Sequence, residues 1–317
     1  MKVLIIRFSS IGDIILTSPA VRYAKKNLDA EVHYLTKKEN EELLKYNPFI
    51  DKIHLYSGNL REILKVLKAE NFDYIFDLHN NLRSFFVKIN LKGKKNSLNK
   101  FNFHKWRMVR LKHKISVPHI VIRYLQTIDN EYDPNFDDHL DFYYLNIENP
   151  MQKFNLPSNY CCFSLGAKHN TKKIPLVSAL ELIKWIDHKI VLIGGNDVVN
   201  DANEIYKVYP DKVTNLCAKL SLSESAQVID KSSMVICSDT GMMHLAAALN
   251  KETIVIWGNT VPGFGMNAYY GKNDNKSTNY EISLKCRPCS RIGFDKCPEK
   301  HFKCMINHDF KEISKNI

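Results

Sequence analysis

MVICSDTGMMHLAAAL, residues 234–249, is the stretch that decides the fold of this chain. Its first four residues are apolar and indicate a buried strand, the next four form a short polar turn, and the alanine-rich remainder favours a helix. The first turn of such a helix presents unpaired backbone N–H groups and a positive dipole end, which suits a pyrophosphate group. Ordinary helix capping by Asp239 or Thr240 explains the polar turn as well. The stretch therefore predicts a strand–turn–helix unit with a candidate anion site at its turn.

Strands separated by helices recur on both sides of this stretch. One series of apolar runs covers residues 3–8, 31–35, 52–56 and 74–78, with helical patterns at 13–27 and 60–70. A second series covers residues 160–165, 189–193, 213–216, 234–237 and 253–257, with a closing helix at 304–317. Such alternation is typical of parallel sheets covered on both faces. It predicts two Rossmann-like domains that face each other across a cleft, residues 1–150 and 151–317, joined by a linker at 130–157 that is rich in Asp, Asn and Pro.

Length and composition are those of an ordinary globular protein. The 317 residues are 44% hydrophobic and 25% charged, enough for two domains. Arg7 and Asp13 interrupt the apolar start, so no secretion signal is expected. No apolar run approaches the roughly 20 residues of a membrane-spanning helix. We therefore expect a cytoplasmic protein whose contact with a membrane, if it makes one, is peripheral.

The net charge of +11 is concentrated in residues 88–114, which hold eight Lys, two Arg and no Asp or Glu. Aromatic residues lie in the same window, and the mixture suits an anionic partner such as a phosphorylated glycolipid, a lipid surface or a nucleic acid. A solvated charged loop is the alternative. Lys94, Lys95 and Lys100 are our candidate contacts to an anionic acceptor.

Two glycine turns follow predicted strands. The first contains Gly12 and Asp13, with one glycine where a dinucleotide fingerprint requires three, which disfavours a nucleotide-dependent oxidoreductase. On local grounds Asp13 is a first-turn carboxylate favoured by the helix dipole. The second turn is Gly194-Gly195, and Asp197 just after it is a candidate to bind ribose hydroxyls, with a plain turn as the alternative.

A cysteine cluster lies near the end of the chain. Cys286 and Cys289 form a tight pair, followed by Cys297 and Cys304. Four thiolates can close a tetrahedral site, so the spacing predicts a structural zinc or iron ion, with reduced buried thiols as the alternative. Together with the basic window, the cluster also allows a nucleic-acid-binding protein with a four-cysteine metal module.

The chain resembles glycosyltransferase family 9, which includes the lipopolysaccharide heptosyltransferases, over almost its whole length. The most specific match is the block DTGMMHLAAAL at residues 239–249. Further matches are Gly12-Asp13 with Ser18-Pro19-Ala20, Leu165-Gly166-Ala167, Lys172-Lys173-Ile174-Pro175 and Trp257-Gly258-Asn259-Thr260. The resemblance implies a GT-B fold.

The resemblance also implies an inverting sugar transfer from a nucleotide-diphosphate donor, with ADP-heptose the first expectation, to a lipopolysaccharide core or related glycan. Asp13 is the implied general base, and Lys172 the cation that stabilises the departing diphosphate without a catalytic metal or organic cofactor. The expected donor-binding residues are Gly12, Gly166, Lys172, Asp197, Asp239, Thr240, Gly241, Met242, Met243 and His244. Arg83 resembles an acceptor-side position and suits an anionic group. These expectations place the enzyme in the cytoplasm, peripheral on the inner membrane, and give it no nucleic-acid partner.

Overall fold

The chain forms two compact units in the structure, a computed structural model that describes residues 1–145, 149–272 and 274–317. Unit 1 comprises Met1–Lys100 and Pro118–Leu145. Unit 2 comprises Phe101–Val117 and the described part of Asn146–Ile317. The basic window at 88–114 is therefore divided between the two units.

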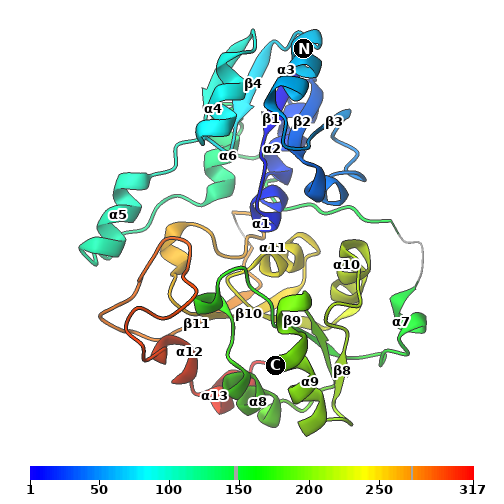
Figure 1. Cartoon of the computed structure of the whole chain (residues 1–317), viewed down its shortest axis with the longest axis vertical. Coiled ribbons are helices and arrows are strands. Elements are labelled where there is room, and N and C mark those ends of the chain that lie inside the picture. Colours follow the sequence, from blue (N-terminus) through cyan, green and yellow to red (C-terminus); the bar gives the residue numbers. More distant parts are fainter. Residues whose placement is uncertain (146–148, 273) are drawn as a thin grey trace. The chain divides into compact units, whose positions relative to one another are not determined.

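Unit 1 is built on a parallel five-stranded sheet in the order β3-β2-β1-β4-β5. Its strands are β1 (Lys2–Ile6), β2 (Glu31–Lys37), β3 (Lys52–Tyr56), β4 (Tyr74–Asp77) and β5 (Lys94–Ser97). Its helices are α1 (Ile11–Ile15), α2 (Ser18–Lys26), α3 (Leu60–Ala69), α4 (Leu82–Ile89) and α6 (Ile120–Ile128), with the 3-10 helix η1 (Lys38–Leu43) after β2. The central strand β1, with the sequence KVLII, is almost wholly buried, as a strand covered on both faces must be (Figure 1).

The helix expected at residues 13–27 is two helices. α1 ends at Ile15 and α2 begins at Ser18, with Pro19 in its first turn. Proline has no N–H to donate and is tolerated only where that donor is unpaired, in the first turn of a helix. The break leaves α1 as a short element that holds Asp13 directly after β1.

Unit 2 contains a parallel six-stranded sheet in the order β11-β10-β9-β6-β7-β8. Its strands are β6 (Cys161–Ser164), β7 (Ile190–Ile193), β8 (Val213–Asn215), β9 (Met234–Ser238), β10 (Glu252–Trp257) and β11 (Ser277–Glu281). Its helices are α5 (Asn102–Arg110), α7 (Pro150–Lys153), α8 (Leu176–Trp185), α9 (Val199–Val208), α10 (Leu222–Lys231), α11 (Gly241–Ala248), α12 (Lys303–Ile306) and α13 (Phe310–Ser314). Single turns of 3-10 helix are η2 (Asn170–Lys172), η3 (Asn196–Val198) and η4 (Pro262–Phe264). The expected closing helix is thus two short helices, α12 and α13.

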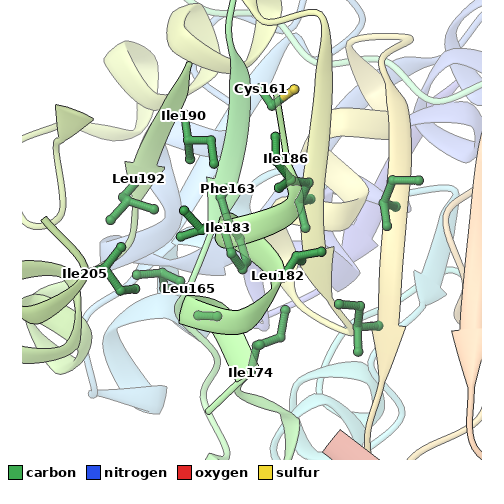
Figure 2. Close-up of a cluster of buried hydrophobic side chains, with 14 of the residues drawn as sticks. Cys161, Phe163, Leu165, Ile174, Leu182, Ile183, Ile186, Ile190, Leu192 and Ile205 are labelled. Atoms are coloured by element: carbon green, nitrogen blue, oxygen red, sulfur yellow. The ribbon is translucent and has the colours of Figure 1, made fainter. Parts of the chain in front are cut away.

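One face of the unit 2 sheet packs against α8, α9 and the closing helices. Figure 2 shows Phe163 of β6 and Leu192 of β7 beside Leu182 and Ile183 of α8 and Ile205 of α9, all fully buried. This core fixes β6 and β7, so the loops that follow these strands start from rigid positions. No helix within the described ranges has the length and apolar character that crossing a membrane requires.

Candidate functional site

An ion pair joins the carboxyl ends of neighbouring strands in unit 2. Lys172 lies in η2 after β6, and its Nζ is 2.6 Å from Oδ2 of Asp239, which follows β9. The hydroxyl of Thr260, after β10, donates to the same oxygen at 2.7 Å. All three side chains are largely buried. Because β10, β9 and β6 are adjacent, residues far apart in sequence meet at one edge, where open parallel sheets bind ligands.

The turn that leads into α11 is not closed by an ordinary cap. Thr240 is the N-cap residue, yet its side chain makes no capping hydrogen bond, and Asp239 bonds to Lys172 and Thr260 instead. The helix start therefore keeps its N–H groups available at a positive dipole end. Gly241 and Met242 are partly exposed there, whereas Met243 and His244 are buried. The backbone of this turn, more than its side chains, suits an anionic ligand.

Several buried polar atoms gather at this edge without a protein partner. Within the described ranges, Oγ of Ser164, Oγ of Ser238, Oγ1 of Thr240 and Oδ1 of Asn259 make no hydrogen bond. Buried polar atoms are normally paired, so each unpaired atom needs an explanation. They end or follow β6, β9 and β10, the strands that position Lys172 and Asp239. Their grouping indicates a site that a polar ligand completes.

Two glycine loops lie side by side at the same edge. A Cβ on Gly166 would lie 3.7 Å from the backbone nitrogen of Gly195, and a Cβ on Gly194 only 2.4 Å from the Val198 side chain. Gly194 therefore admits no side chain. The carboxylate of Asp197 is half exposed and pairs with Nζ of Lys173 at 2.6 Å. Sequence reasoning missed this lysine partner, although Lys173 stands beside Lys172 in the motif.

Asp13 in unit 1 is held by two neighbours. Its Oδ1 is 2.6 Å from the guanidinium of Arg7, and its Oδ2 accepts hydrogen bonds from the backbone N–H of Ser10 at 3.0 Å and from its hydroxyl at 2.6 Å. Arg7 itself is buried and donates to the carbonyls of Leu78 and Ser9. Burial alone would lower the pKa of Arg7, but the charge of Asp13, the neighbouring Tyr124 and Tyr34, and the hydrogen bond to Asp13 together outweigh burial and raise that pKa. The carboxylate is thus oriented at the carboxyl end of β1 while 21% of its side chain stays exposed.

His79 is a further candidate site residue, to which sequence reasoning gave no role although it assigned one to nearby Arg83. It follows β4 and stands edge-on to Phe8 with ring centroids 5.6 Å apart. Burial, and then the charge of Arg7, lower its pKa to about 4, so the imidazole is neutral at neutral pH. Its buried Nδ1 has no hydrogen-bond partner in the described part of the chain. A neutral histidine beside Phe8 and Arg7 offers a ligand a hydrogen-bonding group.

The predicted acceptor residues do not lie together. The guanidinium of Arg83 stands over the rings of Phe8, at 5.6 Å, and Tyr56, at 5.0 Å. Lys100 is close enough to help lower the pKa of His79. Lys94 and Lys95, however, pair in register with the first two residues of β4, at the opposite end of the sheet from Asp13 and His79. The structure groups Arg83 and Lys100 with the carboxyl edge and sets the other two lysines apart from it.

Comparison with known proteins decides the family. The sequence model of glycosyltransferase family 9 (heptosyltransferase) matches residues 60–301. The chain belongs to this family. It is 25% identical to lipopolysaccharide heptosyltransferase 1 of Campylobacter coli over 82% of this chain and 84% of that one.

The solved structures of relatives show the same fold. E. coli ADP-heptose lps heptosyltransferase II has a TM-score of 0.75 at 20% identity, with 99% of this chain and 97% of that one covered. E. coli heptosyltransferase WaaC with ADP-2-deoxy-2-fluoro heptose has a TM-score of 0.69 at 20% identity, with both chains covered completely. The family 9 chain therefore has a GT-B fold with two Rossmann-like units, and it is a glycosyltransferase.

The four cysteines of the terminal cluster are free thiols. Cys286 Sγ lies 3.8 Å from Nε2 of His301, and the thiol of Cys289 donates to the carbonyl of Cys286 at 3.2 Å. Burial raises the pKa of Cys289 to about 12 and that of Cys304 to about 11. Within the described residues no three ligand atoms of this cluster lie within 4.8 Å of one another. A relative at the level of fold, the iron-containing dodecameric glycosyltransferase TibC of E. coli, has a TM-score of 0.58 at 12% identity, with 99% of this chain and 74% of that one covered.

A tighter group of metal-type ligands is His33, His54 and Glu70, at the amino end of the unit 1 sheet. Nδ1 of His33 and Nε2 of His54 are 2.9 Å apart and share a hydrogen bond. Glu70 pairs with Lys2 at 3.0 Å and Lys52 at 2.5 Å. These two ammonium groups already neutralise the carboxylate and would repel a cation. The group is therefore a satisfied polar network in the family 9 chain.

Proposed function

We propose that this family 9 glycosyltransferase moves heptose from ADP-heptose, with inversion at the anomeric carbon, to a lipopolysaccharide core or related glycan. The donor part of this proposal rests on the carboxyl edge of the unit 2 sheet, where Lys172, Asp239 and Thr240 lie. It combines an ammonium group, a helix start and unpaired buried hydroxyls, a combination that suits a diphosphate with an attached sugar. The names of the relatives support heptose and ADP as the donor components.

The donor side belongs to unit 2 in this proposal. Lys172 and the backbone N–H groups of residues 240–243 stabilise the charge that grows on the diphosphate as the bond to the anomeric carbon breaks. Asp239 holds the ammonium of Lys172 in place, and Thr260 holds Asp239. Gly166 and the Gly194-Gly195 turn let backbone approach the nucleotide, and Asp197 binds its ribose.

The acceptor side belongs to unit 1. Asp13 takes the proton of the acceptor hydroxyl as its oxygen attacks the anomeric carbon from the face opposite the leaving group. Arg7 and Ser10 hold the carboxylate in a fixed orientation. One glycosidic bond forms, the bond to ADP breaks, and the proton ends on Asp13. Arg83 and Lys100 attract the anionic acceptor, and Lys94 and Lys95 lie at the opposite end of the sheet. Gly12 lies in α1 beside Asp13 and is a proposed donor contact from unit 1.

The direct test is transfer by the purified chain. It is incubated with ADP-heptose and a lipopolysaccharide acceptor that lacks heptose, and mass spectrometry follows the acceptor. A gain of one heptose, absent with Asp13→Asn, supports the proposal. No gain, with the donor intact at the end of the incubation, contradicts it. Use of such an acceptor would agree with our further proposal that the enzyme acts in the cytoplasm, at the inner surface of the membrane.

We further propose that Cys286, Cys289, Cys297 and Cys304 hold one structural zinc or iron ion. The support is the close spacing of the four thiols in the sequence: Cys286, Cys289 and Cys297 lie in a loop without regular secondary structure, and Cys304 lies in α12, which follows that loop directly. Each thiol must lose its proton to bind a metal ion, so affinity should fall at acidic pH. Elemental analysis of freshly purified protein should give about one equivalent, and less than about a tenth would contradict the site. Removal by a chelator should lower the melting temperature and leave nucleotide affinity unchanged.

A further inference from the structure

Helix α4 of unit 1 turns an apolar stripe toward solvent. Leu82, Phe85, Phe86 and Ile89 are 88%, 50%, 46% and 50% exposed. Their spacing of three, one and three residues places them on one face of a helix. The opposite face is anchored, because Ser84 and Val87 are fully buried against the unit 1 core. A surface helix normally shows polar residues on its outer face, so this stripe is the reverse of the usual pattern.

Basic residues follow the stripe along the chain. Lys92, Lys94 and Lys95 lie in the turn after α4 and at the start of β5, and all three are exposed. α4 lies against β4, and β5 pairs with β4 as the edge strand of the same sheet (Figure 1). Residues 78–128 contain no Asp or Glu, so no acidic residue of this segment offsets the lysines. The surface is both apolar and positively charged.

We propose that this face, which comprises Leu82, Phe85, Phe86, Ile89, Lys92, Lys94 and Lys95, binds the surface of an anionic lipid bilayer. The apolar side chains enter the boundary between headgroups and acyl chains, and the lysines contact anionic headgroups. An eight-residue helix is about 12 Å long against a hydrocarbon core of about 30 Å, so α4 lies along the surface rather than across it. The inference rests on the proposed function in one respect, that a lipid-linked acceptor brings the enzyme to a membrane.

Residue chemistry favours lipid over a protein partner. Protein interfaces are depleted in lysine, whereas helices that lie on membranes combine lysines with Phe and Leu. The placement of Lys94 and Lys95 agrees, because they lie at the opposite end of the sheet from Asp13 and His79. Arg83, in the first turn of α4, is held over Phe8 and Tyr56 and stays with the carboxyl edge. Helix α4 thus carries an acceptor-side arginine in its first turn and a lipid-binding face along its outer side.

The test is co-sedimentation of the full chain with vesicles, without any sugar nucleotide or acceptor. Wild type should bind vesicles of phosphatidylcholine mixed with phosphatidylglycerol, and bind pure phosphatidylcholine much less. Phe85→Ser with Phe86→Ser should lower the partition coefficient by at least about tenfold, because two aromatic side chains no longer insert. The matched control is Tyr206→Ser with Val208→Ser near the end of α9, where the residues are 46% and 55% exposed. Its partition coefficient should equal that of wild type.

A second variant tests the charges. Lys92→Gln, Lys94→Gln and Lys95→Gln together should abolish the preference for anionic vesicles, and salt should weaken wild-type binding in the same way. All substituted side chains are exposed, so circular dichroism and the melting temperature should stay as in wild type. Failure of wild type to bind anionic vesicles, as expected if an acidic protein covers α4, overturns the inference. Wild-type binding by the Phe85 and Phe86 variant overturns it too. Neither result bears on sugar transfer, which is measured separately.

Discussion

Asp13 combines a capping role that the structure shows with a proposed role as general base, and in the sequence these two look like alternatives. Its carboxylate accepts from the backbone N–H of Ser10, the N-cap residue of α1, as a first-turn acid does. Its other oxygen pairs with buried Arg7. The capping interaction therefore leaves the carboxylate available to accept a proton, and it fixes the direction in which the group points. The proposed base is oriented by the contacts that made a purely structural role plausible.

Replacing Asp13 by Asn should lower turnover by roughly 10² to 10⁴, because the amide cannot accept the proton of the attacking hydroxyl. The structure adds a cost to stability. Arg7 is 8% exposed and would lose its counter-ion, although its bonds to two backbone carbonyls remain. We expect a loss of up to about 3 kcal/mol in unfolding free energy. Turnover is therefore measured well below the melting temperature of the variant.

Ser10→Ala is the control for orientation, because it removes one hydrogen bond to Asp13 and keeps the carboxylate. It should lower turnover far less than Asp13→Asn does. Turnover of Asp13→Asn within about threefold of wild type, in folded protein free of wild-type enzyme, would exclude Asp13 as the base.

Lys172 and Lys173 offer a matched pair for the donor site. Lys172 is paired with buried Asp239, and Lys173 with half-exposed Asp197. Lys172→Met should lower turnover by about 10² to 10³, because a cation at the departing diphosphate is lost. Lys173→Met should change turnover by less than about fivefold, since its partner Asp197 is half exposed and such an ion pair contributes little. Steady-state kinetics with ADP-heptose checks both, and equal losses in the two variants would contradict the assignment to Lys172.

At the scale of elements, apolar strands could be predicted from sequence and two polar ones could not. β1 and β9 are continuous apolar runs, which periodicity detects. β5, with the sequence KKNS, and β11, with the sequence STNYE, were missed because their side chains are polar and mostly exposed. Only pairing with β4 and with β10 makes them strands. The break between α1 and α2 was missed although Pro19 marks it. Local signals thus predict the buried elements, while edges depend on neighbours elsewhere in the chain.

His54 of β3 should make unit 1 sensitive to acid. Burial, and then the charge of His33, lower the pKa of His54 to about 4. The unfolded chain binds this proton near pH 6.5, so between pH 6.5 and 4 it holds more protons than the folded chain, and stability falls as the pH falls. The pKa of His79 is also lowered to about 4, so this residue too reduces the stability of the folded chain as the pH falls. Each group contributes about 1.4 kcal/mol per pH unit inside that window.

Glu70 titrates at a lower pH than His54 and His79, so its contribution to stability can be measured separately from theirs. Lys52 and Lys2 lower its pKa to about 2, so its contribution is present above about pH 4.5 and is lost only as the pH falls toward 2. Denaturant unfolding between pH 6.5 and 5 therefore isolates the histidines. His54→Gln should reduce the pH slope by about one proton, and exposed His188→Gln should leave it unchanged. An unchanged slope for His54→Gln would show that His54 titrates normally.

At the scale of the whole molecule, the candidate residues of unit 1 and those of unit 2 differed in how far sequence could predict them. Residues 239–244 form one contiguous motif, so the helix start in unit 2 was found directly. The partners of that motif were not, because Thr260 and Lys172 reach Asp239 only through the strand order of the sheet. In unit 1 the resemblance indicated Asp13, but nothing local indicated that Arg7 and His79 surround it. Contacts between strand ends require the topology, which periodicity does not give.

The donor nucleotide can be tested on the full chain by its effect on stability. A ligand that binds only the folded protein stabilises it by RT ln(1 + [L]/Kd), about 2.7 kcal/mol at a hundred times Kd. ADP should therefore raise the melting temperature more than GDP or UDP at equal concentration, and NAD and short DNA should not raise it. If the two units melt separately, only the transition of unit 2 should move, because the residues proposed to bind the diphosphate, Lys172 and the start of α11, lie in that unit. Lys172→Met should reduce the shift, and Lys173→Met should keep it. A larger rise in melting temperature with NAD or DNA than with ADP would contradict the proposed donor. It would favour an oxidoreductase or a nucleic-acid-binding protein instead.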